Sequence, residues 1–150
     1  MARYAIVTDT DASLPPDVAA QHGIGLVPIS IEFGDDSLRA DFDIADEALF
    51  ERIGREGRLP TTSAPSPGAF CTAFEQALSG GADGVICYCV SSAISATYTA
   101  AQNASDLVDS ARITIVDSAA VSMVQGYMAL AAAEAAAEGA DRDTILAAAT

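Results

Sequence analysis

The stretch Val85-Ile86-Cys87-Tyr88-Cys89-Val90 decides the fold class of this chain, because it is a continuous apolar run bounded by turn residues. Gly80-Gly81 comes before it and Ser91-Ser92 follows it. Such a run is typical of a strand buried on both faces of a parallel sheet, whereas a strand with one face in water alternates apolar and polar residues. The stretch therefore predicts a central strand covered by helices on both sides.

Two further apolar runs, Tyr4-Ala5-Ile6-Val7-Thr8 and Arg112-Ile113-Thr114-Ile115-Val116, predict two more buried strands. Helical patterns separate these runs and follow the last one. The predicted helices cover residues 15–23, 44–55, 67–78, 97–108 and 119–138, and a last one begins at residue 141 and runs to Thr150. The alternation predicts an α/β fold, namely an open, mainly parallel sheet with helices on both faces.

The region between the first two helices is less regular. Residues 24–33 read as one strand, in which Pro28 indicates an edge position or a bulge. Gly34-Asp35-Asp36 is a turn, after which Leu38-Arg39 is expected to pair back as a short hairpin arm.

The composition limits the classes of partner. The chain of 150 residues is 51% hydrophobic, which suits one globular domain with a real core. Its net charge of −14 argues against nucleic acid and against docking on anionic lipid surfaces. The sequence has no apolar run long enough to span a membrane and no signal peptide, so stable membrane insertion is not expected.

The side chains available for catalysis are few. All 7 basic residues are arginine, so a Schiff-base lysine and a P-loop lysine are both absent. The one histidine, His22, lies in a Gln-His-Gly turn and reads as a solvated residue at a helix end. A Ser-His-Asp triad or a histidine-rich metal site would have to use it. We therefore expect no metal and no cofactor.

The 3 cysteines indicate a reducing compartment. Cys87 and Cys89 alternate along one strand and should point to the same face, where they are poor disulfide partners. Cys71 lies in a helical pattern. An odd count without a secretory signal predicts buried thiols in a cytoplasmic protein.

Polar side chains follow each of the predicted buried strands. Asp9 ends the first, Ser91 and Ser92 follow the second, and Asp117 and Ser118 follow the third. Ligands of open α/β sheets bind outside the carboxyl ends of the strands, so these side chains are expected at one edge of the sheet. The alternative is that each is only a helix cap, since serine and aspartate are common caps.

The strand-end aspartates also allow a different function. Asp9 with Asp11, or Asp9 with Asp117, could hold Mg²⁺, which would make the chain a metal-dependent phosphate-ester hydrolase. Ser91 or Ser92 as a nucleophile is a weaker hypothesis, because there is no GxSxG elbow and His22 is the only imidazole base. A third interpretation is a fragment whose exposed apolar face pairs with a copy of itself.

The stretch Leu59-Pro60-Thr61-Thr62-Ser63-Ala64-Pro65-Ser66-Pro67 carries hydroxyls and prolines but no charge. We expect a stiff loop that leads into a helix at Pro67, since proline favours the first turn. Its hydroxyls and the free N–H groups of the helix start suit an anionic head group. A capping loop with spare hydroxyls is the alternative.

These segments together resemble the N-terminal part of the DegV family of bacterial fatty-acid-binding proteins. The segments that match, in the family's order, are Ile6-Val7-Thr8-Asp9-Thr10 with Leu14-Pro15, Gly25-Leu26-Val27-Pro28-Ile29, Leu59-Pro60-Thr61-Thr62-Ser63 with Pro65-Ser66-Pro67, Val90-Ser91-Ser92 with Ser95 and Thr97-Tyr98, and Val116-Asp117-Ser118. Each segment alone is unspecific, and together they span essentially the whole chain.

The resemblance implies a non-catalytic carrier that presents a long-chain fatty acid to a fatty acid kinase. By this resemblance the carboxylate would be held by the hydroxyls of two segments, and four neighbouring residues would support the pocket. The implied head-group ligands are Thr61, Thr62, Ser63, Ser91 and Ser92, and the implied supporting residues are Asp9, Ser95, Asp117 and Ser118.

The chain departs from the family pattern in two ways. Ala93 and Ala96 replace two glycines of the family's serine loop, and alanine tolerates positive φ poorly. Family members are also nearly twice as long, with a second domain that contributes a basic residue and a histidine to the head-group site. Residues 1–150 are therefore expected to be the N-terminal α/β domain, without the family's C-terminal domain.

Overall fold

The apolar run at residues 85–90 forms the central strand of a four-stranded parallel sheet. The computed structural model describes residues 2–149. The strands are β1 (Tyr4–Asp9), β2 (Gly25–Val27), β3 (Ser30–Phe33), β4 (Asp36–Arg39), β5 (Thr61–Ser63), β6 (Gly84–Cys89) and β7 (Ile113–Asp117). The helices are α1 (Pro16–Gln21), α2 (Asp46–Glu56), α3 (Pro67–Ser79), α4 (Thr97–Val108), α5 (Met123–Ala137) and α6 (Arg142–Ala148), with a 3₁₀ turn η1 (Thr10–Ala12).

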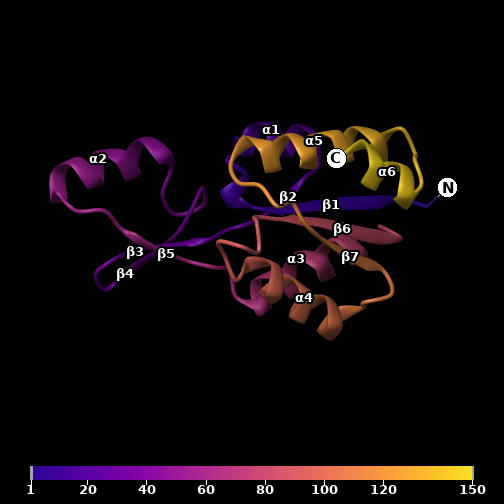
Figure 1. Cartoon of the computed structure of the whole chain (residues 1–150), viewed down its shortest axis with the longest axis horizontal. Coiled ribbons are helices and arrows are strands. Elements are labelled where there is room, and N and C mark those ends of the chain that lie inside the picture. The colour runs from indigo at the N-terminus through magenta and orange to yellow at the C-terminus, as the bar shows by residue number, and fades with distance from the viewer. Residues whose placement is uncertain (1, 150) are drawn as a thin grey trace.

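The large sheet has the strand order β2-β1-β6-β7, and all of its pairs are parallel. Helices α1, α5 and α6 cover one face, and α3 and α4 cover the other (Figure 1). Each face has its own hydrophobic cluster, centred on Ile86 and Tyr88 on the first and on Phe70 and Phe74 on the second. The prediction of an open, mainly parallel α/β sheet covered on both faces is confirmed.

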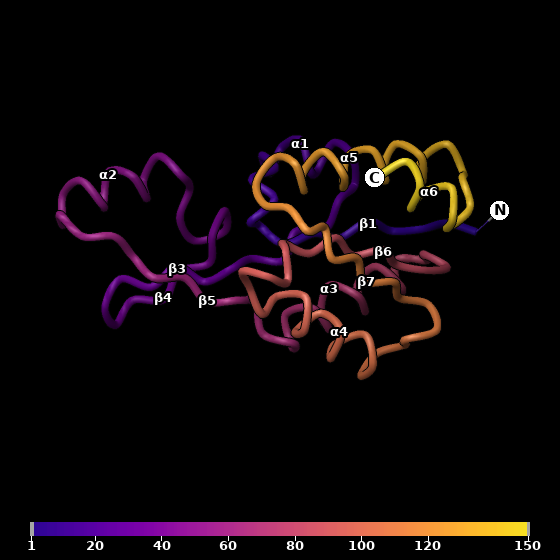
Figure 2. The backbone as a smooth tube through the Cα atoms, viewed as in Figure 1, coloured from indigo at the N-terminus to yellow at the C-terminus, as the bar shows by residue number. Residues whose placement is uncertain are grey.

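The chain leaves this sheet after β2 and builds a separate lobe before it returns at α3, as the backbone trace shows (Figure 2). In the lobe, β3 pairs antiparallel with β4 and with β5, and α2 packs on them. The hairpin predicted for Leu38-Arg39 is confirmed, because Ile31 pairs with Leu38. The lobe has a small cluster of its own around Ile31 and Phe33.

The prediction of one strand over residues 24–33 is wrong, since this stretch forms β2 in the large sheet and β3 in the lobe. Pro28 lies between the two strands and has no N–H to donate to a ladder. Beyond it, the Ile29 N–H donates to Thr10 Oγ1 at 3.0 Å. The crossing between the sheets is thus tied to the carboxyl end of β1.

Two other boundaries differ from the sequence-based expectation. Residues 61–63 form an edge strand rather than a loop, although α3 starts at Pro67 as predicted. The Ser66 Oγ caps this helix by accepting the Ala69 N–H at 3.2 Å. Helix α5 starts at Met123 and not at residue 119, because Ala119 and Ser122 both have positive φ. Within α5, a Cβ on Gly126 would lie 2.8 Å from the Ala12 carbonyl oxygen, so glycine lets this helix approach η1.

Candidate functional site

Asp9 fixes the carboxyl ends of the two central strands to each other. Its side chain is fully buried, Oδ2 accepts the Val90 N–H at 2.9 Å and Oδ1 accepts the Asp11 N–H at 3.0 Å. Burial raises the pKa of the Asp9 carboxyl to about 6, against the hydrogen bond from Val90, which lowers it. Asp9 therefore anchors the start of the loop that carries Ser91 and Ser92.

Asp117, at the end of β7, holds this loop from the other side. Oδ1 accepts the Ser92 N–H at 3.1 Å and the Ala119 N–H at 3.0 Å, and Oδ2 accepts a hydrogen bond from Ser92 Oγ. The hydrogen bond from the Ser92 hydroxyl, followed by that from Ala119, lowers the pKa of the Asp117 carboxyl. Ser92 is therefore oriented by an ionised carboxylate.

The remaining serines after β6 and β7 divide into two kinds. Ser95 Oγ accepts the Thr97 N–H at 3.2 Å, and Ser118 Oγ donates to the Ala120 carbonyl at 3.2 Å. Both hydroxyls thus act in local turns, as the capping interpretation proposed for such residues. Within the described residues 2–149, Ser91 Oγ accepts the Ala93 N–H at 3.3 Å and donates no hydrogen bond, so its proton can be donated to a ligand.

The second hydroxyl segment is β5, the exposed edge of the lobe. Thr62 lies opposite Ile31 in the ladder and lines a cleft of about 510 Å³, together with Thr10 and Ile29. Ser63 Oγ donates to Glu32 Oε1 at 3.3 Å. Within residues 2–149, the hydroxyls of Thr61 and Thr62 form no hydrogen bond, so both can donate to a ligand.

The end of β1 lies next to each of the two hydroxyl segments, through a different residue in each case. Asp9 binds Val90, which precedes Ser91, and the next residue, Thr10, lines the cleft that contains Thr62. Ser91 and Ser92 are not among the residues that line this cleft. The convergence of the two segments on one ligand therefore stays a prediction, and the Asp9-Thr10 corner is the feature that supports it.

The geometry does not favour the metal-dependent hydrolase. No group of three or more His, Cys, Asp or Glu side chains in the described part of the chain is arranged to hold a metal ion. Both Asp9 oxygens accept backbone N–H groups, and Asp117 binds Ser92 and Ala119. The carboxylates therefore position loops.

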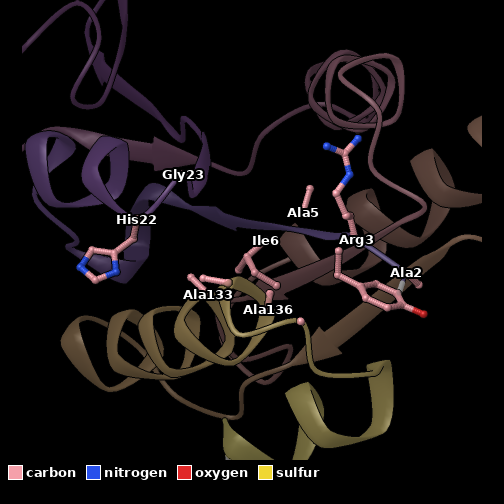
Figure 3. A pocket seen from close by; sticks show the side chains of 11 residues that line it. Ala2, Arg3, Ala5, Ile6, His22, Gly23, Ala133 and Ala136 are labelled. Atoms are coloured by element: carbon pink, nitrogen blue, oxygen red, sulfur yellow. The ribbon is translucent and has the colours of Figure 1, made fainter.

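A second cleft, of about 360 Å³, lies at the opposite, amino ends of the strands. Figure 3 shows that the side chains of Arg3 and His22 point away from one another there. The Arg3 guanidinium donates to the Gly81 carbonyl, and His22 follows the last residue of α1, as predicted for a helix-end residue. Small residues such as Ala133 and Ala136 form its other wall, so no set of polar groups converges on a ligand.

Sequence reasoning missed two polar partners of this region. Gln125 on α5 is fully buried, and its Nε2 donates to Thr8 Oγ1 at 2.9 Å and to the Tyr88 carbonyl at 3.3 Å. Glu32 is the partner of Ser63. An uncharged glutamine inside an alanine-rich helix was the available signal for Gln125, whereas nothing local pointed to Glu32.

Comparison with known proteins gives consistent matches. A family model described as an uncharacterised protein of the DegV family matches residues 3–150. A DegV domain-containing protein of Caldanaerobacter subterraneus is 37% identical over 146 residues, which are 97% of this chain and 51% of that protein. The chain thus spans about half the length of the curated relatives it matches.

Solved structures share the fold over nearly the whole chain. A structure described as fatty acid binding of a DegV family protein from Thermus thermophilus has a TM-score of 0.87 and 33% identity, and covers 98% of this chain and 52% of that one. DegV of Bacillus subtilis, described as a fatty acid binding protein, has a TM-score of 0.90 and 30% identity, with coverages of 99% and 53%. Among the helices of residues 2–149, none has the length and apolar character needed to cross a bilayer.

Proposed function

The chain belongs to the DegV family, and from this premise we propose that it binds a long-chain fatty acid, with the carboxyl head group at the carboxyl end of β1. The observation that carries the proposal is the Asp9-Thr10 corner, which joins the Ser91 loop to the cleft containing Thr62. The descriptions of the Thermus and Bacillus structures as fatty acid binding support the ligand class.

Hydroxyl groups suit this head group. Thr61, Thr62 and Ser91 each keep a proton that they can donate to a carboxyl oxygen. A hydrogen bond between neutral partners contributes about 0.5–1.5 kcal/mol, and one to a charged group about 1.5–3 kcal/mol. Each buried CH₂ of the acyl chain adds about 0.8 kcal/mol, so the tail supplies most of the gross affinity.

We propose further that the protein is a carrier without bond chemistry of its own, which presents the fatty acid to a separate kinase. Exposed hydroxyls leave a head group accessible to a second protein, which supports this role. The relatives' double length supports the proposal that residues 1–150 act as the N-terminal α/β domain of a two-domain carrier. The three free cysteines support a cytoplasmic location.

Lipid extraction followed by mass spectrometry tests the proposal. We expect the purified protein to carry a fatty acid, or to take up palmitate added to the lipid-free form. Thr62→Val keeps the shape but removes a donor, and should weaken palmitate binding about five- to tenfold. Ser110→Ala, an exposed serine in the turn before β7, is the matched control and should leave the affinity unchanged.

An empty protein that also ignores added palmitate and oleate would overturn the proposal. Equal palmitate affinities of the wild type and Thr62→Val would show that the head group does not bind at β5. A hydrolase would instead show magnesium-dependent release of phosphate from phosphate esters, lost in Asp9→Asn.

A further inference from the structure

Gln125 is a polar side chain in the apolar contact between α5 and the large sheet. Helix α5 packs on β1 and β6 (Figure 1), and its other buried residues are Gly126 and alanines. The Gln125 side chain is 0% exposed. Glutamine is mostly found at the surface, and a buried polar group is usually held by specific hydrogen bonds. Packing alone therefore does not explain why glutamine stands at this position.

The Gln125 amide binds the carboxyl ends of both central strands. Its Nε2 donates to Thr8 Oγ1 on β1 at 2.9 Å and to the Tyr88 carbonyl on β6 at 3.3 Å. Thr8 Oγ1 in turn donates to the same Tyr88 carbonyl at 2.9 Å. One side chain of α5 thus links the residue before Asp9 to the end of β6.

The two strands do not need the Gln125 amide to satisfy their own polar groups. The Thr8 hydroxyl would still donate to the Tyr88 carbonyl if the amide were removed. The Gln125 Oε1 is itself buried and accepts no hydrogen bond within residues 2–149. Because a buried acceptor without a partner lowers stability, an apolar side chain of the same size should stabilise the fold at least as well. What glutamine adds is a fixed link between the helix and the strands.

The start of α5 is held firmly against the end of β1. The Ser122 N–H donates to the Asp11 carbonyl oxygen at 2.8 Å. A Cβ on Gly126 would lie 2.8 Å from the Ala12 carbonyl oxygen, so the helix and η1 are in close contact. Gln125 therefore extends from a helical turn that has little freedom to move.

The link reaches the candidate head-group site through Asp9. Asp9 Oδ2 accepts the Val90 N–H at 2.9 Å, and Val90 precedes Ser91. Burial raises the pKa of the Asp9 carboxyl, whereas the hydrogen bond from Val90 and then that from the Gln125 side chain lower it. Gln125 thus contacts the carboxylate that holds the start of the Ser91 loop, and this loop places the Ser91 proton that can be donated to a ligand.

We propose that Gln125 is a positioning residue for the fatty acid head group, which holds the ends of β1 and β6 and, through Asp9, the Ser91 loop in the geometry that binds a carboxyl oxygen. The inference rests on the proposed function, because it names a further residue of the same site. Groups that a longer protein adds around the head group would act in addition to this link.

Two ligands with the same tail test the inference. Palmitate and hexadecanol differ only in the head group, so the ratio of their affinities for the whole chain reports how well the head group is positioned. Gln125→Met removes the amide and keeps a flexible side chain of similar size. We expect it to weaken palmitate binding about tenfold, the lower end of what one hydrogen bond to a charged group contributes, and hexadecanol binding less than about twofold.

A purely structural role of Gln125 predicts a different pattern. It would lower the urea midpoint of Gln125→Met, whereas the unpartnered Oε1 leads us to expect a midpoint equal to that of the wild type or higher. Ile145→Val is the matched core control, because Ile145 is 0% exposed and belongs to the cluster that contains the alanines of α5. This control should lower the midpoint and leave the ratio of the two affinities unchanged.

Substitutions of Thr8 test the same link from β1. Thr8→Val removes the hydroxyl that Gln125 binds, and Thr8→Ser keeps it. We expect Thr8→Val to lower the ratio of palmitate to hexadecanol affinity in the same direction as Gln125→Met, and Thr8→Ser to retain the ratio of the wild type. These two variants decide the inference if Gln125→Met does not fold.

The outcomes separate the inference from the proposed function. Wild-type affinity ratios in both Gln125→Met and Thr8→Val, with palmitate bound, would overturn the inference and leave fatty acid binding intact. An equal loss for palmitate and hexadecanol, together with a lower urea midpoint, would assign Gln125 a structural role and also overturn it. A wild-type protein that binds neither palmitate nor oleate would overturn the proposed function, and the inference with it.

Discussion

The four-stranded sheet and the three-stranded lobe bury their apolar side chains to different extents. Every residue of β6 is buried, and Phe70 and Phe74 beneath it are 0% exposed. In the lobe, α2 has no buried residue, Phe50 is 68% exposed and all of β5 is exposed. Apolar burial therefore fixes the large sheet, whereas a small cluster and surface ion pairs hold the lobe.

The difference extends to the candidate site, which takes one segment from each region. Ser91 and Ser92 follow a fully buried strand, and Asp9 and Asp117 hold their loop by hydrogen bonds. Thr62 lies exposed on an edge strand of the lobe, and its hydroxyl forms no hydrogen bond within residues 2–149. The first segment is preorganised, and the second has the freedom to adjust to a ligand.

The largest expected effect comes from truncating one phenylalanine in each region. Phe74→Ala, in the core under the large sheet, should lower the free energy of unfolding by about 3–5 kcal/mol through lost burial and a cavity. Phe50→Ala on α2 should change it by less than about 0.5 kcal/mol. Urea unfolding of both variants measures the difference, and similar midpoints would remove the contrast between the regions.

The second-largest effect is a dependence of stability on pH, caused by the buried carboxyl group of Asp9. The pKa of Asp9 is about 6 in the folded protein and 3.8 as the ordinary value, so between these pH values the native state binds the extra proton. Stability should be greatest below pH 3.8 on this account, fall by about 3 kcal/mol as the pH rises to 6, and stay level above.

Asp9→Asn should remove this decline. Chemical denaturation of the wild type and Asp9→Asn between about pH 4 and pH 7 isolates it, since the other carboxylates titrate in both proteins. Parallel pH profiles would show that burial does not raise the pKa of this carboxyl.

The same contrast explains which parts of the molecule the sequence could predict. The continuous apolar run at 85–90 needed no partner to be recognised, because a strand buried on both faces carries that signal locally. The polar stretch Thr61–Ser63 has no such pattern and becomes a strand only by pairing with β3, about thirty residues away. The strand at Thr61–Ser63 therefore cannot be predicted without knowing that β3 is its partner.

The candidate site divides in the same way. Hydroxyls after buried strands were predictable, because the carboxyl ends of parallel strands share one edge. The donors and acceptors among them were not, since the proton of Ser92 depends on Asp117 and that of Ser63 on Glu32, contacts set by the register of neighbouring strands. The types of residue at the candidate site could therefore be predicted from the sequence, whereas their roles as hydrogen-bond donors or acceptors could not.

A smaller effect is expected from a substitution of Phe33, and it tests whether the lobe unfolds independently of the large sheet. Phe33 is 2% exposed, and the Arg52 guanidinium carbon lies 4.2 Å from the centre of its ring. Phe33→Leu keeps an apolar side chain but removes the cation–π contact, which should cost about 1 kcal/mol. Hydrogen exchange should then accelerate in β3 and not in β6. Phe42→Leu, an exposed ring 5.7 Å from Arg39, is the control, and equal acceleration in β6 would show that the two regions unfold together.

The smallest expected effect lies on the surface of the lobe, at Asp43. Its carboxylate accepts hydrogen bonds from the Arg39 side chain at 2.9 Å and from the Arg39 N–H at 2.9 Å, which lower its pKa to about 2. The pH dependence of stability that Asp43 causes is opposite in sign to that of Asp9. The Arg39–Asp43 pair stabilises the protein above pH 3.8, and this stabilisation is lost as the pH falls towards 2. Both side chains are partly or largely exposed, so salt should screen the contribution.

Thermal unfolding of Asp43→Asn at low salt and at about 1 M salt measures this contribution. We expect a small loss of Tm at neutral pH that shrinks in high salt and also shrinks as the pH falls towards 2, where the wild-type carboxylate is itself becoming protonated. Asp35→Asn, in the turn between β3 and β4 and outside any ion pair of residues 2–149, should not show this dependence on salt and pH. A loss that persists in high salt would mean that the Arg39 N–H bond, rather than the charge pair, stabilises this turn, and the lobe would then depend on backbone geometry more than on its surface charges.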